Sequence, residues 1–235
     1  LQTTETLRRR FVSDASHELK TPLAAIRLLT DSILQTDNMD METVRDFVTD
    51  IGSEAERLSR ITEDLLRLTR LDSNQVDPPE VVEVAPVLEQ VMRMMSLLAQ
   101  EKGTELTCQT GGDCRVLATK GEVHQVIYNL TDNAVKYSGS HGSVRVELRR
   151  DGNDVVLTVA DNGPGIPEED LPRVFERFYR VDKARSRAAG GTGLGLSIVQ
   201  DTVTKRGGTV SAANRPEGGA VFTVRWPAAE GGGAV

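Results

Sequence analysis

The chain has 235 residues, which is enough for one large domain or two ordinary ones, each able to bury a core of its own. Its 28 basic and 35 acidic residues give a net charge of −7 and are interspersed, which argues against nucleic acid as a partner. No apolar run approaches the roughly 18 residues of a membrane-spanning helix, and no signal segment leads the sequence. The two cysteines, Cys108 and Cys114, lack the spacing of a zinc site. These features predict a soluble, cytosolic chain of two domains with reduced thiols.

The first part of the chain carries two stretches of helical periodicity. From Val12 to Ile33 the apolar residues follow at steps of three and four, which predicts a helix that ends near residue 35. Residues 36–40 are short and polar and predict a turn, after which the pattern resumes from Val44 to Leu68 with a wider apolar stripe. Two helices of about 30 residues cannot bury such stripes against each other alone, so we expect a homodimeric four-helix bundle. A monomeric coiled-coil stalk is the alternative.

The remainder interleaves strand and helix patterns. Strands are predicted at residues 81–84, 105–110, 144–148, 155–159, 209–213 and 220–226. Helices are predicted from near Pro86 to about residue 102 and over residues 121–137. Short turns link most adjacent strands, which favours a mixed sheet with helices on one face.

The expected organisation is a helical hairpin at residues 1–74 and an α/β domain at residues 81–228. A linker at residues 75–80 contains two prolines and separates them. Residues 229–235 are predicted to be a disordered tail.

One face of the first helix carries a candidate phosphoacceptor. His17 occupies the heptad slot that faces away from the partner helix, which alone would make it an ordinary surface residue. Pro22 lies inside the heptad run, where it kinks the helix at a cost of about 3 kcal/mol, so the local shape has a purpose. Glu18 is adjacent and Thr21 lies one turn along the same face. A carboxylate that accepts the Nδ1 proton would leave Nε2 of His17 as a nucleophile.

The predicted helix at residues 121–137 has a polar face where a core face should be apolar. Asn129, Asn133, Lys136 and Tyr137 share that side, because Asn133 lies four residues after Asn129, and Lys136 and Tyr137 lie three and four residues after Asn133. Asparagine oxygens suit Mg²⁺, lysine neutralises phosphate, and a tyrosine ring can lie against a base or sugar. A solvated helix face is the alternative.

Two glycine motifs follow, and both permit close approach of a ligand to the backbone. The first, with Asp161, Gly163 and Gly165, comes directly after a strand. The second opens a predicted helix, whose amides and N-terminus form a ready phosphate site, although a plain glycine-rich turn has the same composition. Its residues are Gly191, Thr192, Gly193, Leu194 and Gly195. The segment between the motifs, which includes residues 175–180, is interpreted as a mobile lid.

Taken in order, these segments resemble the sensor histidine kinases of bacterial two-component systems over nearly the whole chain. Residues 16–23 are similar to the family's H box and residues 129–137 to its N box. The two glycine boxes correspond to residues 161–165 and 191–195, and the F box to residues 175–179.

The resemblance implies an α+β protein in which a dimeric, phosphoacceptor helical hairpin precedes a Bergerat-type ATP-binding sandwich, as in gyrase, Hsp90 and MutL. It implies autophosphorylation of His17 by ATP, with Glu18 as base, and transfer to an aspartate in the receiver domain of a response regulator. It also implies phosphatase activity toward that regulator, with Thr21 positioning water.

The resemblance also assigns roles in the nucleotide site. Asp161 would accept the adenine amino proton, while Asn133 and Asn129 would hold Mg²⁺. Lys136 would contact phosphate, and Arg180 the γ-phosphate. Tyr137 and the residues of both glycine boxes, namely Gly163, Gly165, Gly191, Thr192, Gly193, Leu194 and Gly195, complete the expected ATP-binding set.

The sequence departs from the family pattern at residues 118–122, which lack the Asp and Arg often found there, so we expect reduced stability at the start of that helix. Sensor, transmembrane and receiver segments are absent. We therefore interpret the chain as the cytoplasmic portion of an inner-membrane sensor, with membrane contact only through N-terminal segments outside this sequence. The alternatives are a related ATPase that transfers phosphate to water or serine, and a dimeric scaffold that binds nucleotide without catalysis.

Overall fold

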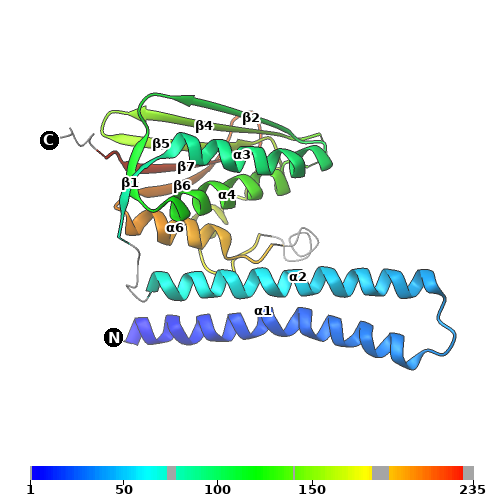
Figure 1. The fold of residues 1–235 in the computed structure, drawn as a ribbon. Helices are drawn as coiled ribbons and strands as arrows, with labels where there is room; N and C mark the ends of the chain where they lie inside the picture. Colours follow the sequence, from blue (N-terminus) through cyan, green and yellow to red (C-terminus); the bar gives the residue numbers. More distant parts are fainter. Residues whose placement is uncertain (1, 73–77, 140, 182–190, 230–235) are drawn as a thin grey trace.

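The computed structural model describes residues 2–72, 78–139, 141–181 and 191–229. It consists of a long helical hairpin and a second domain that packs beside it (Figure 1). Residues 75–77 of the predicted linker and residues 230–235 of the predicted tail lie outside the described residues, and β1 already begins at the last linker position, Glu80. None of the helices in the described ranges is both long enough and apolar enough to cross a bilayer.

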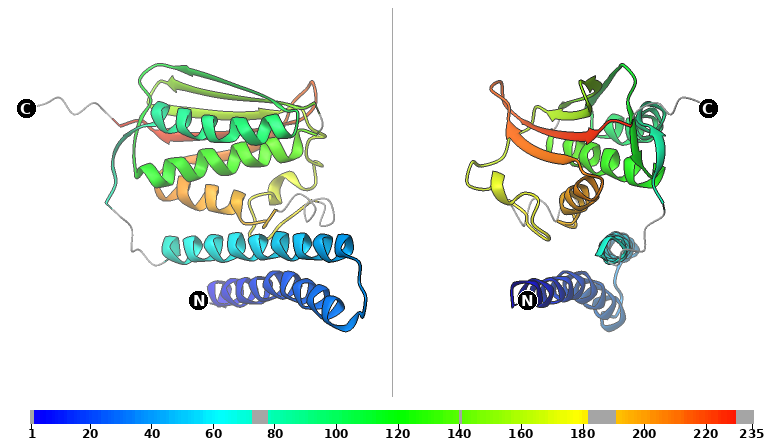
Figure 2. Two further views of the ribbon diagram at one scale, coloured as in Figure 1. Left: turned by 45° about the vertical axis from the view of Figure 1, so that its right-hand side comes forward. Right: turned by 90° about the vertical axis from the view of Figure 1, so that its left-hand side faces the viewer.

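The hairpin consists of α1 (Gln2–Gln35) and α2 (Met41–Asp72), as the periodicity predicts. Asp40 caps α2, because its carboxylate accepts hydrogen bonds from the Thr43 N–H at 2.9 Å and the Thr43 hydroxyl at 2.8 Å. Pro22 is buried inside α1, which remains one helix and curves toward its C-terminal end (Figure 1). α2 lies between α1 and the second domain in both views of Figure 2.

The second domain is built on a five-stranded mixed sheet. Its elements are β1 (Glu80–Glu83), α3 (Val84–Glu101), β2 (Glu105–Gly111), β3 (Arg115–Ala118), α4 (Lys120–Tyr137), β4 (Ser143–Asp151), β5 (Asp154–Asp161), the 3₁₀ turn η1 (Leu171–Arg173), α6 (Gly195–Lys205), β6 (Thr209–Asn214) and β7 (Ala220–Pro227). The strand order is β2-β4-β5-β7-β6, in which β2 and β4 are parallel and the other neighbours antiparallel. Helices α3, α4 and α6 cover one face of this sheet (Figures 1 and 2). The predicted layer plan is confirmed.

The structure adds a strand that the sequence did not predict. β3 is only four residues long and pairs with β1 in a separate two-stranded sheet, with Val82 opposite Val116. Both side chains are about 1% exposed, so this small sheet closes one end of the core. The main core forms where the buried alternate residues of the strands meet the buried faces of the three helices.

The start of α4 is well anchored, so the expectation of reduced stability there is wrong. Thr119 and Glu122 form a reciprocal capping box, in which the Thr119 Oγ1 accepts from the Glu122 N–H at 3.1 Å and the Glu122 carboxylate accepts from the Thr119 N–H at 2.9 Å. Arg206, just beyond α6, donates two hydrogen bonds of 2.9 Å to the same carboxylate. This network fixes α4 against α6, and α4 carries the predicted nucleotide ligands.

Substitution of Thr119 by alanine is expected to lower the free energy of unfolding of this domain by about 1 kcal/mol, because it removes the cap. Urea unfolding can be followed through Trp226, the single tryptophan, which is buried in β7. Thr204→Ala, at an exposed position near the end of α6, is the matched control and should change stability by less than about 0.5 kcal/mol. Equal effects of the two substitutions would contradict the capping role.

Candidate active site

A cavity of about 370 Å³ lies between α2, α4 and the two glycine motifs. Most of the predicted ATP-binding residues line it, namely Asn129, Asn133, Lys136, Tyr137, Asp161, Gly165, Arg180, Gly191, Thr192, Gly193 and Gly195. Gly163 and Leu194 do not line the cavity. The structure thus brings together residues that are up to 66 positions apart in the chain, such as Asn129 and Gly195.

The polar face of α4 forms one wall of the cavity. The Asn129 amide nitrogen donates to the Gly195 carbonyl at 3.1 Å, and its oxygen accepts from Gln125 at 2.8 Å. The Lys136 ammonium lies 2.6 Å from the Asp132 carboxylate. Asn133, between them in the chain, makes no side-chain hydrogen bond within the described residues, so its oxygen is available to a ligand. A cation and amide oxygens on one wall suit a metal-bound phosphate.

Asp161 lies at the end of β5 and is about 4% exposed. Its Oδ1 accepts hydrogen bonds from the N–H of Gly163 at 2.8 Å and of Ala220 at 3.3 Å, which leaves Oδ2 for the cavity. Burial raises the pKa of Asp161, although these two N–H groups and Arg215 oppose the shift. The geometry presents one carboxylate oxygen to a hydrogen-bond donor such as an amino group.

Glycines permit close backbone approaches on both sides of Asp161. A Cβ on Gly163 would lie 2.3 Å from the Tyr137 carbonyl oxygen, and one on Gly219 would lie 2.0 Å from the Asp161 carbonyl oxygen. Gly163 therefore has a structural reason to be glycine even though it does not line the cavity.

The second glycine box is tied to the F box and to the hairpin. The Gly193 carbonyl accepts from the Phe178 N–H at 2.8 Å, and Gly193 has a φ of +74°. Leu194 is fully buried and packs with Ile198 and with Leu68 of α2. The Leu194 side chain thus has a packing role, and its predicted part in ATP binding stays a prediction. Residues 182–190, the C-terminal part of the predicted lid, lie outside the described residues.

Sequence reasoning missed the contribution of α2 to this cavity. Arg60, Glu63, Asp64 and Arg67 line it from the hairpin side. Thr192 Oγ1 donates to Asp64 Oδ2 at 2.7 Å, and Arg67 donates to the Gln125 side-chain oxygen. A polar stripe at helical spacing, opposite the apolar face of α2, could have indicated this contribution.

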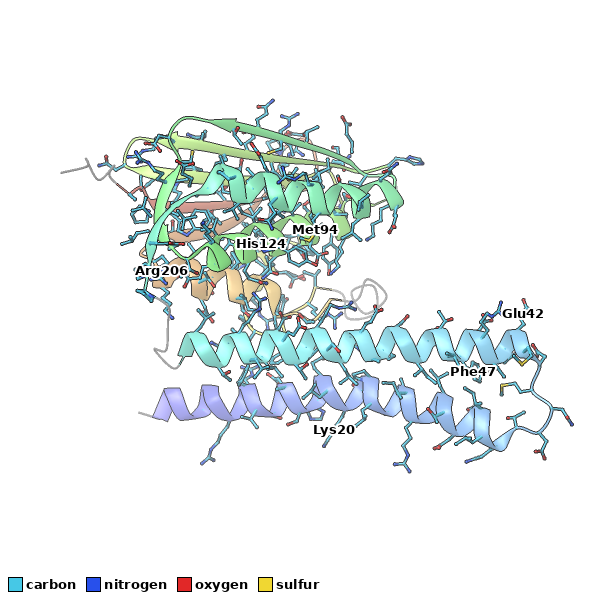
Figure 3. All side chains as sticks on the ribbon, viewed as in Figure 1. Lys20, Glu42, Phe47, Met94, His124 and Arg206 are labelled. Atoms are coloured by element: carbon cyan, nitrogen blue, oxygen red, sulfur yellow. The ribbon has the colours of Figure 1, made fainter. Side chains whose placement is uncertain are left out.

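The candidate phosphoacceptor does not line the cavity. His17 is exposed, and Lys20, three residues later on the same face of α1, points away from the second domain (Figure 3). The Thr21 hydroxyl donates to the His17 carbonyl at 3.2 Å. The Glu18 carboxylate lies 3.1 Å from an Arg57 guanidinium nitrogen and 3.7 Å from one of Arg180. Glu18 is thus held by two arginines, one from each domain.

Both domains match known families. Residues 7–74 match the His kinase A (phospho-acceptor) domain, and residues 119–230 match the histidine kinase-, DNA gyrase B- and HSP90-like ATPase family. The sensor-like histidine kinase SenX3 of Mycolicibacterium smegmatis is 37% identical over 224 residues, which cover 95% of this chain and 58% of SenX3. The probable sensor histidine kinase TcrY of Mycobacterium tuberculosis is 39% identical over 226 residues, covering 96% and 47%. The chain spans about half the length of these relatives.

Solved structures agree with this assignment. Full-length ShkA in complex with AMPPNP is 30% identical with a TM-score of 0.66, over 95% of this chain and 45% of ShkA. The histidine kinase ThkA, in a complex with the response regulator protein TrrA, shares the fold with a TM-score of 0.79 at 22% identity, over 97% and 64% of the two chains.

Fold and site together define a phosphoacceptor hairpin joined to an ATP-binding domain of the gyrase and Hsp90 type. The chain belongs to the sensor histidine kinases of two-component systems.

Proposed function

We propose that the chain binds ATP in the cavity beside α4, transfers the γ-phosphoryl group to His17, and passes it to an aspartate of a response regulator. The observation that supports this best is that one cavity gathers the N-box side chains, Asp161 and the second glycine box. An exposed histidine on a helix of the neighbouring domain supplies an acceptor.

Each residue has a physical task in this reaction. Asp161 Oδ2 would accept the adenine amino proton, and Lys136 would balance phosphate charge. Thr192 and the N-terminus of α6 would donate hydrogen bonds to phosphate oxygens. Glu18 would accept the Nδ1 proton of His17 and so direct Nε2 toward phosphorus.

The donor set suits Mg²⁺. Asn133 would supply one amide oxygen, and Asn129 a second once Gln125 releases it. The described residues contain no cluster of three acidic, histidine or cysteine side chains that could hold an ion by themselves. An ion here would therefore take most ligands from phosphate and water, which is the habit of Mg²⁺, and it would neutralise phosphate charge.

Transfer to His17 requires the second domain to move relative to the hairpin. His17 lies outside the cavity and is exposed, although Glu18 and Phe11 of the same helix contact the second domain. Such a movement is compatible with transfer within one protomer and with transfer between two protomers.

The experiment that tests this function is incubation with γ-labelled ATP followed by separate acid and base treatment. Label on His17 is expected to be lost in acid and to survive base. Label that survives acid and is lost in base would indicate a serine acceptor. Phosphate release without protein label would indicate an ATPase, and nucleotide binding with neither would indicate a scaffold.

The hairpin has an unpaired apolar surface that fits a second copy of the chain. Val12, Leu23, Leu28, Leu34 and Val48 are each more than half exposed. A homodimeric four-helix bundle would bury this surface. The response regulator would approach the exposed face of α1 that carries His17, and the longer protein would reach the membrane through segments that precede this sequence.

Thr21 is assigned to dephosphorylation of the regulator, and Thr21→Ala should separate the two activities. We expect autophosphorylation within about threefold of the parent, worth under about 1 kcal/mol, and loss of phosphatase activity with the cognate regulator. The alternative is that Thr21 only relieves the backbone before Pro22. Thr30→Ala is the matched control, because Thr30 makes the same bond to the carbonyl four residues earlier. Under the alternative, both activities and the helical circular dichroism signal of Thr21→Ala would fall together.

Asn133→Ala should weaken binding of Mg²⁺-ATP by about tenfold or more and binding of metal-free ATP by less than about threefold, because the proposed role of Asn133 is ligation. Isothermal titration calorimetry with and without Mg²⁺ measures both values. Equal losses in the two titrations would show that the substitution disturbs α4 instead.

A further inference from the structure

Two predicted nucleotide ligands contact the hairpin directly in this structure. The Thr192 hydroxyl donates to Asp64 at 2.7 Å, and the Arg180 guanidinium lies 3.7 Å from Glu18. A third predicted ligand, Asn129, is linked to the hairpin indirectly, because its oxygen accepts from Gln125, whose own oxygen accepts from Arg67 of α2. Two of the predicted phosphate ligands are thus among the groups that hold the two domains together.

The hairpin groups that bind Thr192 and Arg180 are both carboxylates. A carboxylate oxygen offers the same chemistry as a phosphate oxygen, namely an anionic acceptor for a hydroxyl or a guanidinium group. The Arg180 side chain is about 4% exposed and also lines the cavity, so a phosphate there would compete with Glu18 for the same guanidinium group. Asp64 places a negative charge in the cavity next to Thr192, where a triphosphate would bring more negative charge.

Apolar contacts reinforce this docked arrangement. Leu68 of α2 packs against Leu194 and Ile198, and all three side chains are essentially fully buried. The rings of Phe11 and Phe178 lie 5.9 Å apart. The polar contacts therefore lie beside a small dry interface, which strengthens them relative to contacts in open water.

We infer that Asp64 and Glu18 act as intramolecular mimics of phosphate, so that docking of the hairpin and binding of the triphosphate exclude each other. The inference rests on the proposed ATP-binding function. A triphosphate would take Thr192 and Arg180 from their carboxylates and release the second domain. The same exchange would take Arg180 away from Glu18, beside His17, and leave Arg57 of α2 as the arginine that contacts this carboxylate.

Only undocked molecules would bind a triphosphate. The apparent affinity for a triphosphate is therefore the affinity of the undocked state multiplied by the fraction of molecules that are undocked. Removal of the Asp64 carboxylate should therefore strengthen triphosphate binding. Adenosine carries no phosphate and does not compete for Thr192 or Arg180, so its affinity should not respond.

The test compares Asp64→Ala with Asp50→Ala in the full 235-residue chain. Asp50 lies on the same helix and is an aspartate too, but it is exposed and does not line the cavity. Isothermal titration calorimetry with a non-hydrolysable ATP analogue should give about tenfold tighter binding for Asp64→Ala, because a hydrogen bond to a charged acceptor is lost from the competing state. Asp50→Ala should change affinity by less than about twofold, and adenosine should bind all three proteins alike.

Amide hydrogen exchange of the parent protein gives an independent measurement. The triphosphate analogue should increase exchange in α2 around Asp64 and Leu68, and adenosine should not. If Asp64→Ala and Asp50→Ala behave alike, or if the analogue protects α2, the phosphate-mimic inference is overturned while ATP binding stands. If no variant binds the analogue, the proposed function is overturned, and the inference with it.

Discussion

His17→Gln is expected to abolish incorporation of label from γ-labelled ATP, by at least about a thousandfold, because glutamine has no nucleophilic nitrogen at neutral pH. Nucleotide affinity should stay within about twofold of the parent, since His17 is exposed and does not line the cavity. A filter-binding assay for label and calorimetry for affinity measure the two quantities on the same preparation.

The chain supplies its own control, because it has only three histidines. His141 is exposed and lies outside the cavity, so His141→Gln should retain full labelling. Persistence of acid-labile label in His17→Gln would move the acceptor assignment to another histidine. Loss of label in both variants would indicate a general defect instead of a missing acceptor.

Asp161→Asn is expected to weaken ATP binding by about 30-fold to 100-fold. If the amide nitrogen faces the adenine amino group, two donors meet. If the amide oxygen faces it, the hydrogen bond lacks the negative charge that strengthened it. A purine nucleotide without the exocyclic amine should lose much less affinity, which calorimetry with both ligands can establish. Equal losses for the two nucleotides would contradict the proposed contact.

The same substitution should stabilise the nucleotide-free protein at neutral pH. Burial raises the pKa of Asp161 in the folded state, so the folded protein binds this proton more tightly than the unfolded chain does. The resulting stability is fully present below the unfolded pKa and is lost as the pH rises through the folded pKa. At pH 7 the buried, ionised carboxylate therefore lowers the free energy of unfolding. The neutral amide of Asp161→Asn would remove this destabilisation, and its oxygen could still accept hydrogen bonds from the Gly163 and Ala220 N–H groups. Urea unfolding at pH 7 should show a gain, and the gain should shrink as the pH falls.

A loss of both affinity and stability in Asp161→Asn would show that the carboxylate mainly supports the fold. A gain in stability with a loss of affinity would show that this position serves binding at the expense of stability, as polar residues in binding sites commonly do.

Local patterns were sufficient to predict most of the elements and one wall of the site. Helical spacing alone placed Asn129, Asn133 and Lys136 on one face of α4, because that spacing depends only on residues within one helix. β3 escaped prediction because four residues carry little periodicity and its partner β1 lies more than 30 positions earlier in the chain.

Contacts between the two hairpin helices and between the two domains could not be predicted from these patterns. The spacing between Glu18 and Arg57 says nothing about their approach across the hairpin, and the approach of Asp64 to Thr192 depends on how two domains dock. The expectation of reduced stability at residues 118–122 was wrong for a similar reason, because Arg206, which binds Glu122, lies just beyond α6 and far along the chain.

The two close approaches around Asp161 limit how this site can change by mutation. A methyl group at Gly163 or Gly219 would overlap a backbone oxygen at 2.3 or 2.0 Å, and backbone atoms cannot rotate away as a side chain can. The end of the cavity at Asp161, where we propose that adenine binds, is therefore shaped by two positions that have no room for a side chain. A variant with altered base preference would have to arise through Asp161 or the cavity walls, because single substitutions at these two glycines displace the strand end that holds the carboxylate.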